Sequence, residues 1–161
     1  MARRRSSSRT RLGVLDGAAS AALLAVPGAA SAAVTSSVTN GDLTVTSDAG
    51  DAIVITDVGG NVKVNGADPG NGPAASSTID TIVVTGGPDA NNIDLKGVHG
   101  NAFTALTSVS VDGAGGDDLI SGTQLADLLE GGDGNDRIIG DDNPAGTDDD
   151  MRGEDGNDTM V

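Results

Sequence analysis

The chain of 161 residues carries a formal net charge of −15, with 25 glycines, no cysteine and one aromatic residue, Phe103. Disulfide bonds are therefore excluded, nucleic acid is not expected as a partner, and a core must be built from Val, Ile, Leu and Ala without the large area that aromatic side chains usually bury. Fifteen acidic residues lie from Asp112 onward against only Arg137 and Arg152, so this C-terminal part of the chain repels itself unless a cation neutralises it.

Residues 1–32 are predicted to be a secretory signal peptide. Five arginines precede an apolar run from Gly17 to Val26, Pro27 ends this run, and the sequence Ala-Ser-Ala at 30–32 offers a cleavage site between small residues. A disordered basic tail is the alternative interpretation. The apolar run is too short to span a bilayer, so we expect no transmembrane segment and a protein that is secreted to the extracellular space.

Residues 33–76 are predicted to form short β-strands, a hairpin and a loop. The stretch 33–40 is rich in Ser and Thr and is interpreted as a linker. The runs DLTVTS, AIVITDV and NVKVNG follow it, and their alternating pattern is typical of strands. Gly59-Gly60 between the last two runs predicts a tight β-hairpin, and the Gly- and Pro-rich stretch 66–77 predicts a loop.

From Ser77 to Val161 the chain follows a period of nine residues. With Gly113, Gly122 and Gly131 each at position one, position eight is apolar in every block, allowing for a slip of four residues after Gly140. These position-eight residues are Val84, Ile93, Ala102, Val111, Ile120, Leu129, Ile138, Met151 and Met160. One apolar residue per block cannot be buried unless blocks stack, and the glycine density argues against a helix. We therefore expect an all-β fold in which residues 77–161 form a parallel β-roll, a right-handed β-solenoid.

Aspartate recurs at position six of the blocks and gives the turns the chemistry of a cation site. If two blocks make one full passage through the roll, Asp118, Asp136 and Asp158 line one edge. Asp127 and Asp149 then line the opposite edge. Ca²⁺ takes about six to eight oxygen ligands and accepts backbone carbonyls as well as carboxylates, while glycine allows the turn to approach the ion closely.

The stretch GGDGNDRII, residues 131–139, matches the pattern G-G-x-G-x-D-x-U-x, where U is a large apolar residue. On this motif the chain resembles the RTX, or hemolysin-type calcium-binding repeat, family. The copies at 113–121 and 153–161 also match well. The copy at 122–130 lacks glycine at positions two and four, and the copy that contains Asn91 has asparagine where the family has aspartate.

The resemblance implies a parallel β-roll that binds Ca²⁺, mainly within residues 113–161. By this resemblance Asp118, Asp136 and Asp158 would be ligands, with backbone carbonyls as co-ligands from Gly113, Gly131, Asp133 and Gly153. Asp127 and Asp149, on the opposite edge, are further candidate ligands. We therefore expect an exported calcium-binding protein that the ion folds, and no enzymatic activity. A calcium-dependent adhesion or surface-layer component, or the truncated repeat region of a secreted RTX-type enzyme, are the alternatives. Residues 33–112 contain no HExxH or GxSxG motif.

Overall fold

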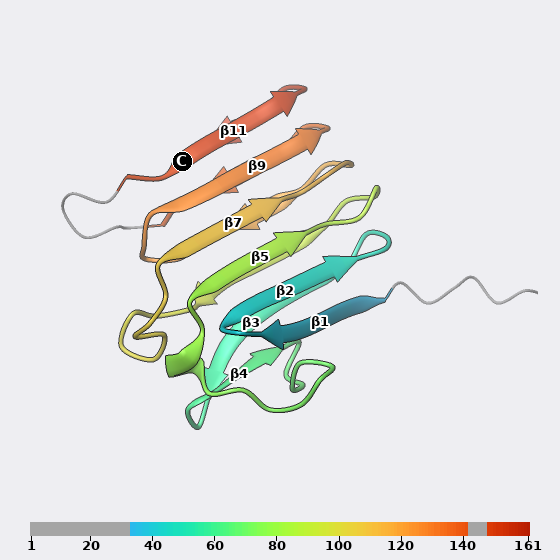
Figure 1. Ribbon diagram of the computed structural model, residues 1–161. Helices are drawn as coiled ribbons and strands as arrows, with labels where there is room; N and C mark the ends of the chain where they lie inside the picture. Colours follow the sequence, from blue (N-terminus) through green and yellow to red (C-terminus); the bar gives the residue numbers. More distant parts are fainter. Residues whose placement is uncertain (1–32, 142–147) are drawn as a thin grey trace, which may run out of the picture. The chain divides into compact units, whose positions relative to one another are not determined.

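The computed structural model describes residues 33–141 and 148–161, and the strands in these ranges build two six-stranded sheets (Figure 1). Sheet A contains, in spatial order, β1 (Val34–Thr39), β2 (Asp42–Ser47), β5 (Thr81–Thr85), β7 (Ser108–Asp112), β9 (Asp127–Asp133) and β11 (Asp150–Asp155). Sheet B contains β12 (Thr159–Met160), β10 (Arg137–Ile139), β8 (Leu119–Ser121), β6 (Asn92–Gly97), β3 (Ala52–Val58) and β4 (Asn61–Val64). The described residues add one short 3-10 helix, η1 (Ser76–Thr78), and no α-helix, so the fold class is all-β. The predicted signal peptide lies outside the described residues.

From β5 onward the chain alternates between the two sheets, and every strand in this part pairs parallel with its neighbours. We call one passage through both sheets a coil. Ile120 on β8 lies opposite Ile138 on β10, which is two nine-residue blocks further along the chain. Ile138 in turn lies opposite Met160, two blocks plus the slip of four residues. The predicted two blocks per coil therefore hold in this region.

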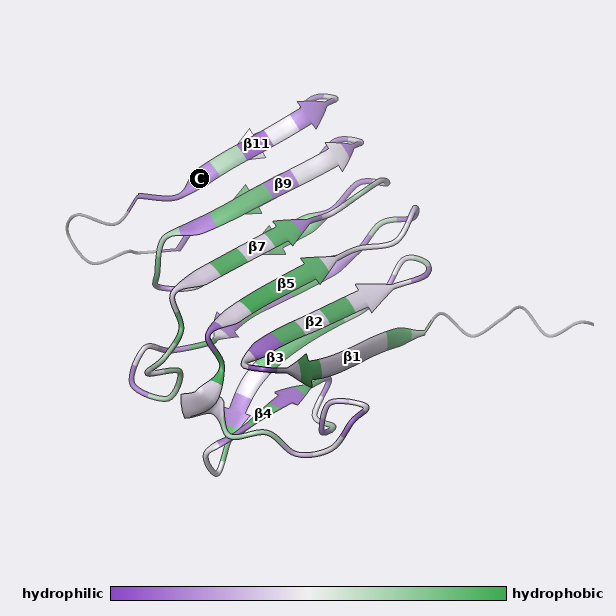
Figure 2. Cartoon of the chain, in the orientation of Figure 1, coloured by the Kyte–Doolittle hydropathy of each residue, from purple (hydrophilic) through white to green (hydrophobic). Residues whose placement is uncertain are grey.

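The core is made almost entirely of aliphatic side chains from both sheets, and apolar residues recur along the strands in Figure 2. Six of the nine predicted position-eight residues are at most 1% exposed: Val84, Ile93, Val111, Ile120, Leu129 and Ile138. Met151 is partly buried against this core, whereas Met160 on β12 is 49% exposed. The nine-residue phase thus predicts the inward-facing side chains correctly for most of the repeat region.

Ala102 is partly buried against the core, but it lies in a loop and not in the short strand that the nine-residue phase predicts. Ile93 on β6 pairs with Ile120 on β8, three blocks further on, so this coil contains one additional block. The additional block forms the loop 98–107 in place of a strand. Within it the backbone N–H groups of Ala102 and Phe103 both donate to the carbonyl oxygen of His99, and the turn directs the phenyl ring of Phe103 into the core.

The N-terminal segment joins the same two sheets through antiparallel hairpins. The interpretation of residues 33–40 as a linker is wrong. This stretch contains β1, which pairs antiparallel with β2. Its sequence VTSSVT alternates in burial, so its valines face inward despite the polar composition. The predicted hairpin at Gly59-Gly60 is confirmed: β3 and β4 pair antiparallel, and both glycines have the positive φ that a tight hairpin turn requires.

The connections at the two edges of the sheets differ in their regularity. Where the chain passes from sheet A to sheet B, the segments 86–91, 113–118, 131–136 and 153–158 each span positions one to six of a block. We call these segments turns, although the first three residues of the last two still belong to β9 and β11. We call this the A-to-B edge, and it lies at the arrowheads of the labelled sheet-A strands from β5 to β11 in Figure 1. Where the chain returns from sheet B to sheet A, the connections differ in length and conformation.

Candidate cation site

A single file of aspartate and asparagine side chains runs along the A-to-B edge. Its members are Asp51, Asn91, Asp118, Asp136 and Asp158, one per coil. Each member's backbone N–H donates to the side-chain Oδ1 of the next, at 3.1, 2.7, 2.8 and 3.0 Å in chain order. We call this file the Asx ladder. It brings together the three aspartates predicted for this edge and adds Asn91, which stands at the same position of its repeat copy, and Asp51, which lies outside the repeat pattern.

The opposite edge holds Asp127 and Asp149, as predicted, and the backbone N–H of Asp127 donates to Asp149 Oδ1 at 3.0 Å. Asp127 is 4% exposed, but both of its carboxylate oxygens have donors within the protein. The Thr123 N–H donates to Oδ2 at 2.5 Å and the Thr123 hydroxyl to Oδ1 at 2.8 Å. Burial nevertheless raises the pKa of Asp127 to about 6, against the lowering effect of these hydrogen bonds. Sequence reasoning missed Thr123.

Asp118 and Asp136 differ from Asp127 because one oxygen of each carboxylate is buried without a donor. The two residues are 3% and 2% exposed, and the Oδ2 atom of each has no hydrogen-bond partner. Burial raises the pKa of Asp118 to about 6, with the nearby charge of Asp136 adding to the increase. Burial also raises the pKa of Asp136. A buried, unpaired carboxylate oxygen is unfavourable unless a proton or a cation reaches it.

The first glycine of each turn leaves a space that these unpaired oxygens share with a carbonyl group. A Cβ atom at Gly113 would lie within 3.0 Å of both Asp118 Oδ2 and the carbonyl oxygen of Gly131. At Gly131 the same holds for Asp136 Oδ2 and the carbonyl oxygen of Gly153. We call each space a cradle. Any other residue at position one would fill it, which explains the glycine, and the oxygens that meet there are those that Ca²⁺ accepts.

The other predicted ligands take varied places around these cradles. The carbonyl oxygen of Gly113 faces the equivalent space at Gly86, one coil earlier. The carbonyl oxygen of Asp133 accepts a hydrogen bond from the Gly116 N–H at 2.8 Å, and its side chain is exposed. Asp158 ends the described ladder and is partly buried.

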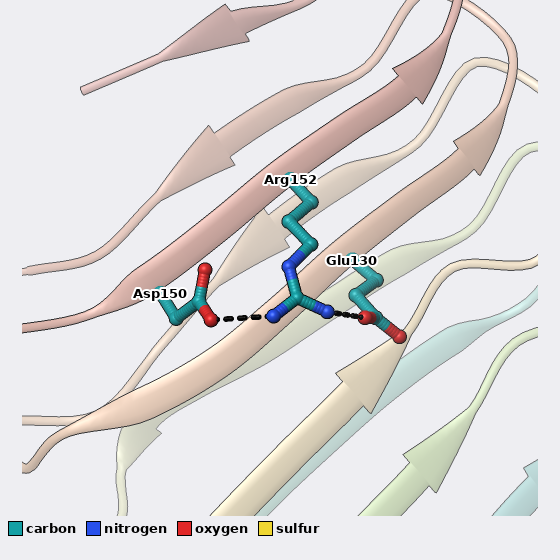
Figure 3. Close-up of polar contacts among 3 residues, drawn as sticks. All are labelled: Glu130, Asp150 and Arg152. Atoms are coloured by element: carbon teal, nitrogen blue, oxygen red, sulfur yellow. Dashed lines mark hydrogen bonds and ion pairs between the residues drawn. The ribbon is translucent and has the colours of Figure 1, made fainter.

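Arginine neutralises part of the acidic surface at a different place. Arg152 lies between Glu130 and Asp150 on sheet A and forms a 2.6 Å ion pair with each (Figure 3). Ion pairs between such exposed side chains contribute little to the stability of a protein, because solvent screens them. Among the described residues, the ion pairs do not include Asp118 or Asp136, so the ladder carboxylates receive no basic side chain.

Comparison of the chain with protein-family models, with curated proteins and with solved structures finds no match. Within residues 33–141 and 148–161, no three His, Cys, Asp or Glu side chains are grouped so that they could hold one metal ion together. In the same ranges no helix has the length and apolar character needed to cross a membrane. The candidate site is therefore defined by its own geometry: one buried carboxylate oxygen and one backbone carbonyl at each glycine cradle.

Proposed function

We propose that this chain is an exported calcium-binding protein in which Ca²⁺ binds between successive turns of the A-to-B edge. The observation that carries the proposal is the pair of buried, unpartnered oxygens, Asp118 Oδ2 and Asp136 Oδ2, each facing a glycine carbonyl of the next coil. These groups are all hydrogen-bond acceptors, so a cation satisfies them where a further protein acceptor cannot. Ca²⁺ suits such a site better than Mg²⁺, which requires a compact octahedral shell and releases water reluctantly.

The charge distribution supports a role of the ion in folding. Each added coil places another carboxylate on the ladder directly beside the previous one, within the C-terminal part from Asp112 onward that carries fifteen acidic residues. A cation that bridges two turns removes this repulsion and holds the coils together. Because such a site does not exist in the unfolded chain, the free energy of ion binding adds to the stability of the folded state.

The repeat geometry supports a β-roll as the architecture that the ion stabilises. Strands two blocks apart pair in parallel, strands alternate between two sheets, and the residues at position eight are buried between them. The resemblance of GGDGNDRII to the calcium-binding nonapeptide points to the same architecture. Export through the predicted signal peptide would deliver the protein to the extracellular space. We propose binding, and not catalysis, as its function.

Calorimetric titration of the full chain with calcium chloride tests the proposal, alongside circular dichroism in chelator and in millimolar calcium. We expect saturable binding, a gain of β signal on adding calcium, and a much weaker response to magnesium. Asp42→Ala removes an exposed carboxylate that does not belong to the ladder and should leave the number of bound ions unchanged. A chain with the same β spectrum in chelator and calcium, and without saturable heat, would contradict the proposal.

A further inference from the structure

The turn 86–91 has the same construction as the turns that carry Asp118 and Asp136. It begins with glycine, spans six residues and places Asn91 on the Asx ladder, where this side chain is 3% exposed. The Asn91 N–H donates to Asp118 Oδ1 at 2.7 Å, and Asn91 Oδ1 accepts from the Asp51 N–H at 3.1 Å. Asn91 is therefore the structural equivalent of Asp118 one coil earlier.

The second polar atom of the Asn91 side chain is a hydrogen-bond donor, whereas the second oxygen of Asp118 is an acceptor. Asn91 Nδ2 donates to the carbonyl oxygens of Gly87 at 3.2 Å and Asp89 at 2.6 Å, both within its own turn. The amide orientation follows from its partners, because a backbone N–H faces the oxygen and two carbonyls face the nitrogen. In the turn of Asp118 the corresponding atom is an oxygen that has no donor.

The Asn91 amide nitrogen also lies at the cradle of Gly86, the space equivalent to the one proposed to hold an ion at Gly113. A Cβ atom at Gly86 would lie 3.0 Å from Asn91 Nδ2 and closer still to the carbonyl oxygen of Gly113. At Gly113 the same construction meets Asp118 Oδ2 and the Gly131 carbonyl. One position in two successive coils thus holds an N–H donor in the first coil and an unpartnered acceptor in the second.

We propose that the Asn91 amide replaces a bound cation, so that asparagine or aspartate at position six decides whether a turn requires the ion. The proposal rests on the proposed calcium-binding function. In turn 86–91 the protein supplies its own donor to the carbonyls, and the turn closes without metal. In the turns of Asp118 and Asp136 only acceptors meet, and the positive charge must come from solution.

The preceding ladder member supports this division of the chain. Asp51 Oδ2 accepts a hydrogen bond from the Ser47 hydroxyl at 2.5 Å, so this carboxylate also has a protein donor on its second oxygen. Self-sufficient turns therefore occupy the N-terminal coils, and the turns with unpartnered oxygens begin at Asp118. The N-terminal coils form an ion-independent base on which the calcium-dependent coils stack.

Two reciprocal substitutions test the proposal in the full chain, with calcium chloride as the titrant. Asn91→Asp should bind one ion more than the wild type and should unfold at a lower urea concentration in chelator. Asp118→Asn should bind one ion fewer and unfold at a higher urea concentration in chelator. Asn92→Asp is the matched control, because it adds the same charge to an exposed neighbouring side chain, and its ion count should equal that of the wild type.

The outcomes separate this proposal from the function on which it rests. If the wild type binds no calcium, the proposed function fails and this proposal fails with it. If the wild type binds calcium but Asn91→Asp and Asn92→Asp bind the same number of ions, only the role of Asn91 is overturned. If Asn91→Asp does not fold even in calcium, Asp118→Asn decides: an unchanged ion count, or no gain of stability in chelator, overturns the proposal.

Discussion

Replacing Gly113 with alanine places a methyl group in the cradle between Asp118 and the next coil. The added Cβ lies within 3.0 Å of Asp118 Oδ2 and of the Gly131 carbonyl oxygen. Gly115→Ala in the same turn is the matched control, because its nearest neighbour, the Pro88 carbonyl oxygen, is 3.5 Å away, an ordinary contact. Neither glycine has a left-handed φ, so alanine introduces no backbone strain at either position.

The magnitude follows from these contacts. Overpacking a tightly filled position costs about 1–3 kcal/mol, whereas alanine in place of an unstrained glycine stabilises by about 0.4–1 kcal/mol through the unfolded chain. In chelator, Gly113→Ala should therefore lower the free energy of unfolding while Gly115→Ala leaves it unchanged or raises it. A lost contact to a charged group is worth about 1.5–3 kcal/mol, so calcium at this cradle should bind roughly 10- to 150-fold more weakly in Gly113→Ala.

Calorimetric titration with calcium chloride and urea unfolding in chelator measure both effects on the same two variants. We expect Gly113→Ala to lose one high-affinity ion and Gly115→Ala to keep the wild-type binding isotherm. If both variants bind calcium as the wild type does, the cradle at Gly113 is not a cation site. If both lose binding equally, the effect comes from the turn as a whole and the assignment of this particular space is wrong.

Three further results are expected. Asp136→Ala should weaken calcium binding more than Asp158→Ala. Both variants lose one acceptor of the ladder, but only Asp136→Ala removes an unpartnered buried oxygen; equal effects in titration would refute this order. Ile138→Asp should abolish the calcium-induced folding that circular dichroism measures, since Ile138 is fully buried. Arg137→Asp changes an exposed side chain and should preserve this folding. A similar loss in both variants would refute the assignment of Ile138 to the core. The pKa of Asp118 is raised from 3.8 to about 6, so the ionised carboxyl destabilises the metal-free fold at neutral pH. In chelator, the free energy of unfolding measured with urea should rise as the pH falls from 7 toward 4, by up to about 3 kcal/mol from this group. Calcium affinity should fall below pH 6. A free energy of unfolding that declines steadily with acidification would contradict this prediction.

The sequence predicts the strands of the repeat region well because inward side chains must be apolar at a fixed phase. The same signal does not reveal the local structure at Ala102, which packs partly buried against the core but lies in the loop 98–107. Its block has no Gly-Asp turn to fix the following strand, and phase alone does not distinguish a strand from a loop of equal length. The strand β1 escaped prediction because its serines and threonines resemble a linker, although the alternation of its valines was present.

The candidate site could be predicted only in part. The spacing of the aspartates correctly places three of them on one edge, because strand register carries the repeat through space. The spacing does not reveal which carboxylate oxygens accept a hydrogen bond from a group of the protein. Thr123 satisfies Asp127 through a local hydrogen bond, whereas Asp118 and Asp136 have no such neighbour, and this difference depends on turn conformation. The repeat motif alone treats these three residues as equivalent.

The unequal edges of the two sheets determine where this protein can acquire new sequence. On the A-to-B edge the backbone N–H of each ladder residue donates to the side chain of the ladder residue one coil further on. Inserting a single residue into turn 113–118 would therefore move Asp118 out of register with Asn91 and Asp136. Within the residues that the structure describes, the return connections carry no continuous ladder, and they already include the ten-residue loop 98–107 and the short turn 122–126. Foreign peptides inserted at the exposed residues Gly100 and Asn101 of this loop should therefore be tolerated, whereas its buried residues Val98 and Phe103 must be kept. The A-to-B edge keeps a fixed number of residues in each turn from 86–91 onward.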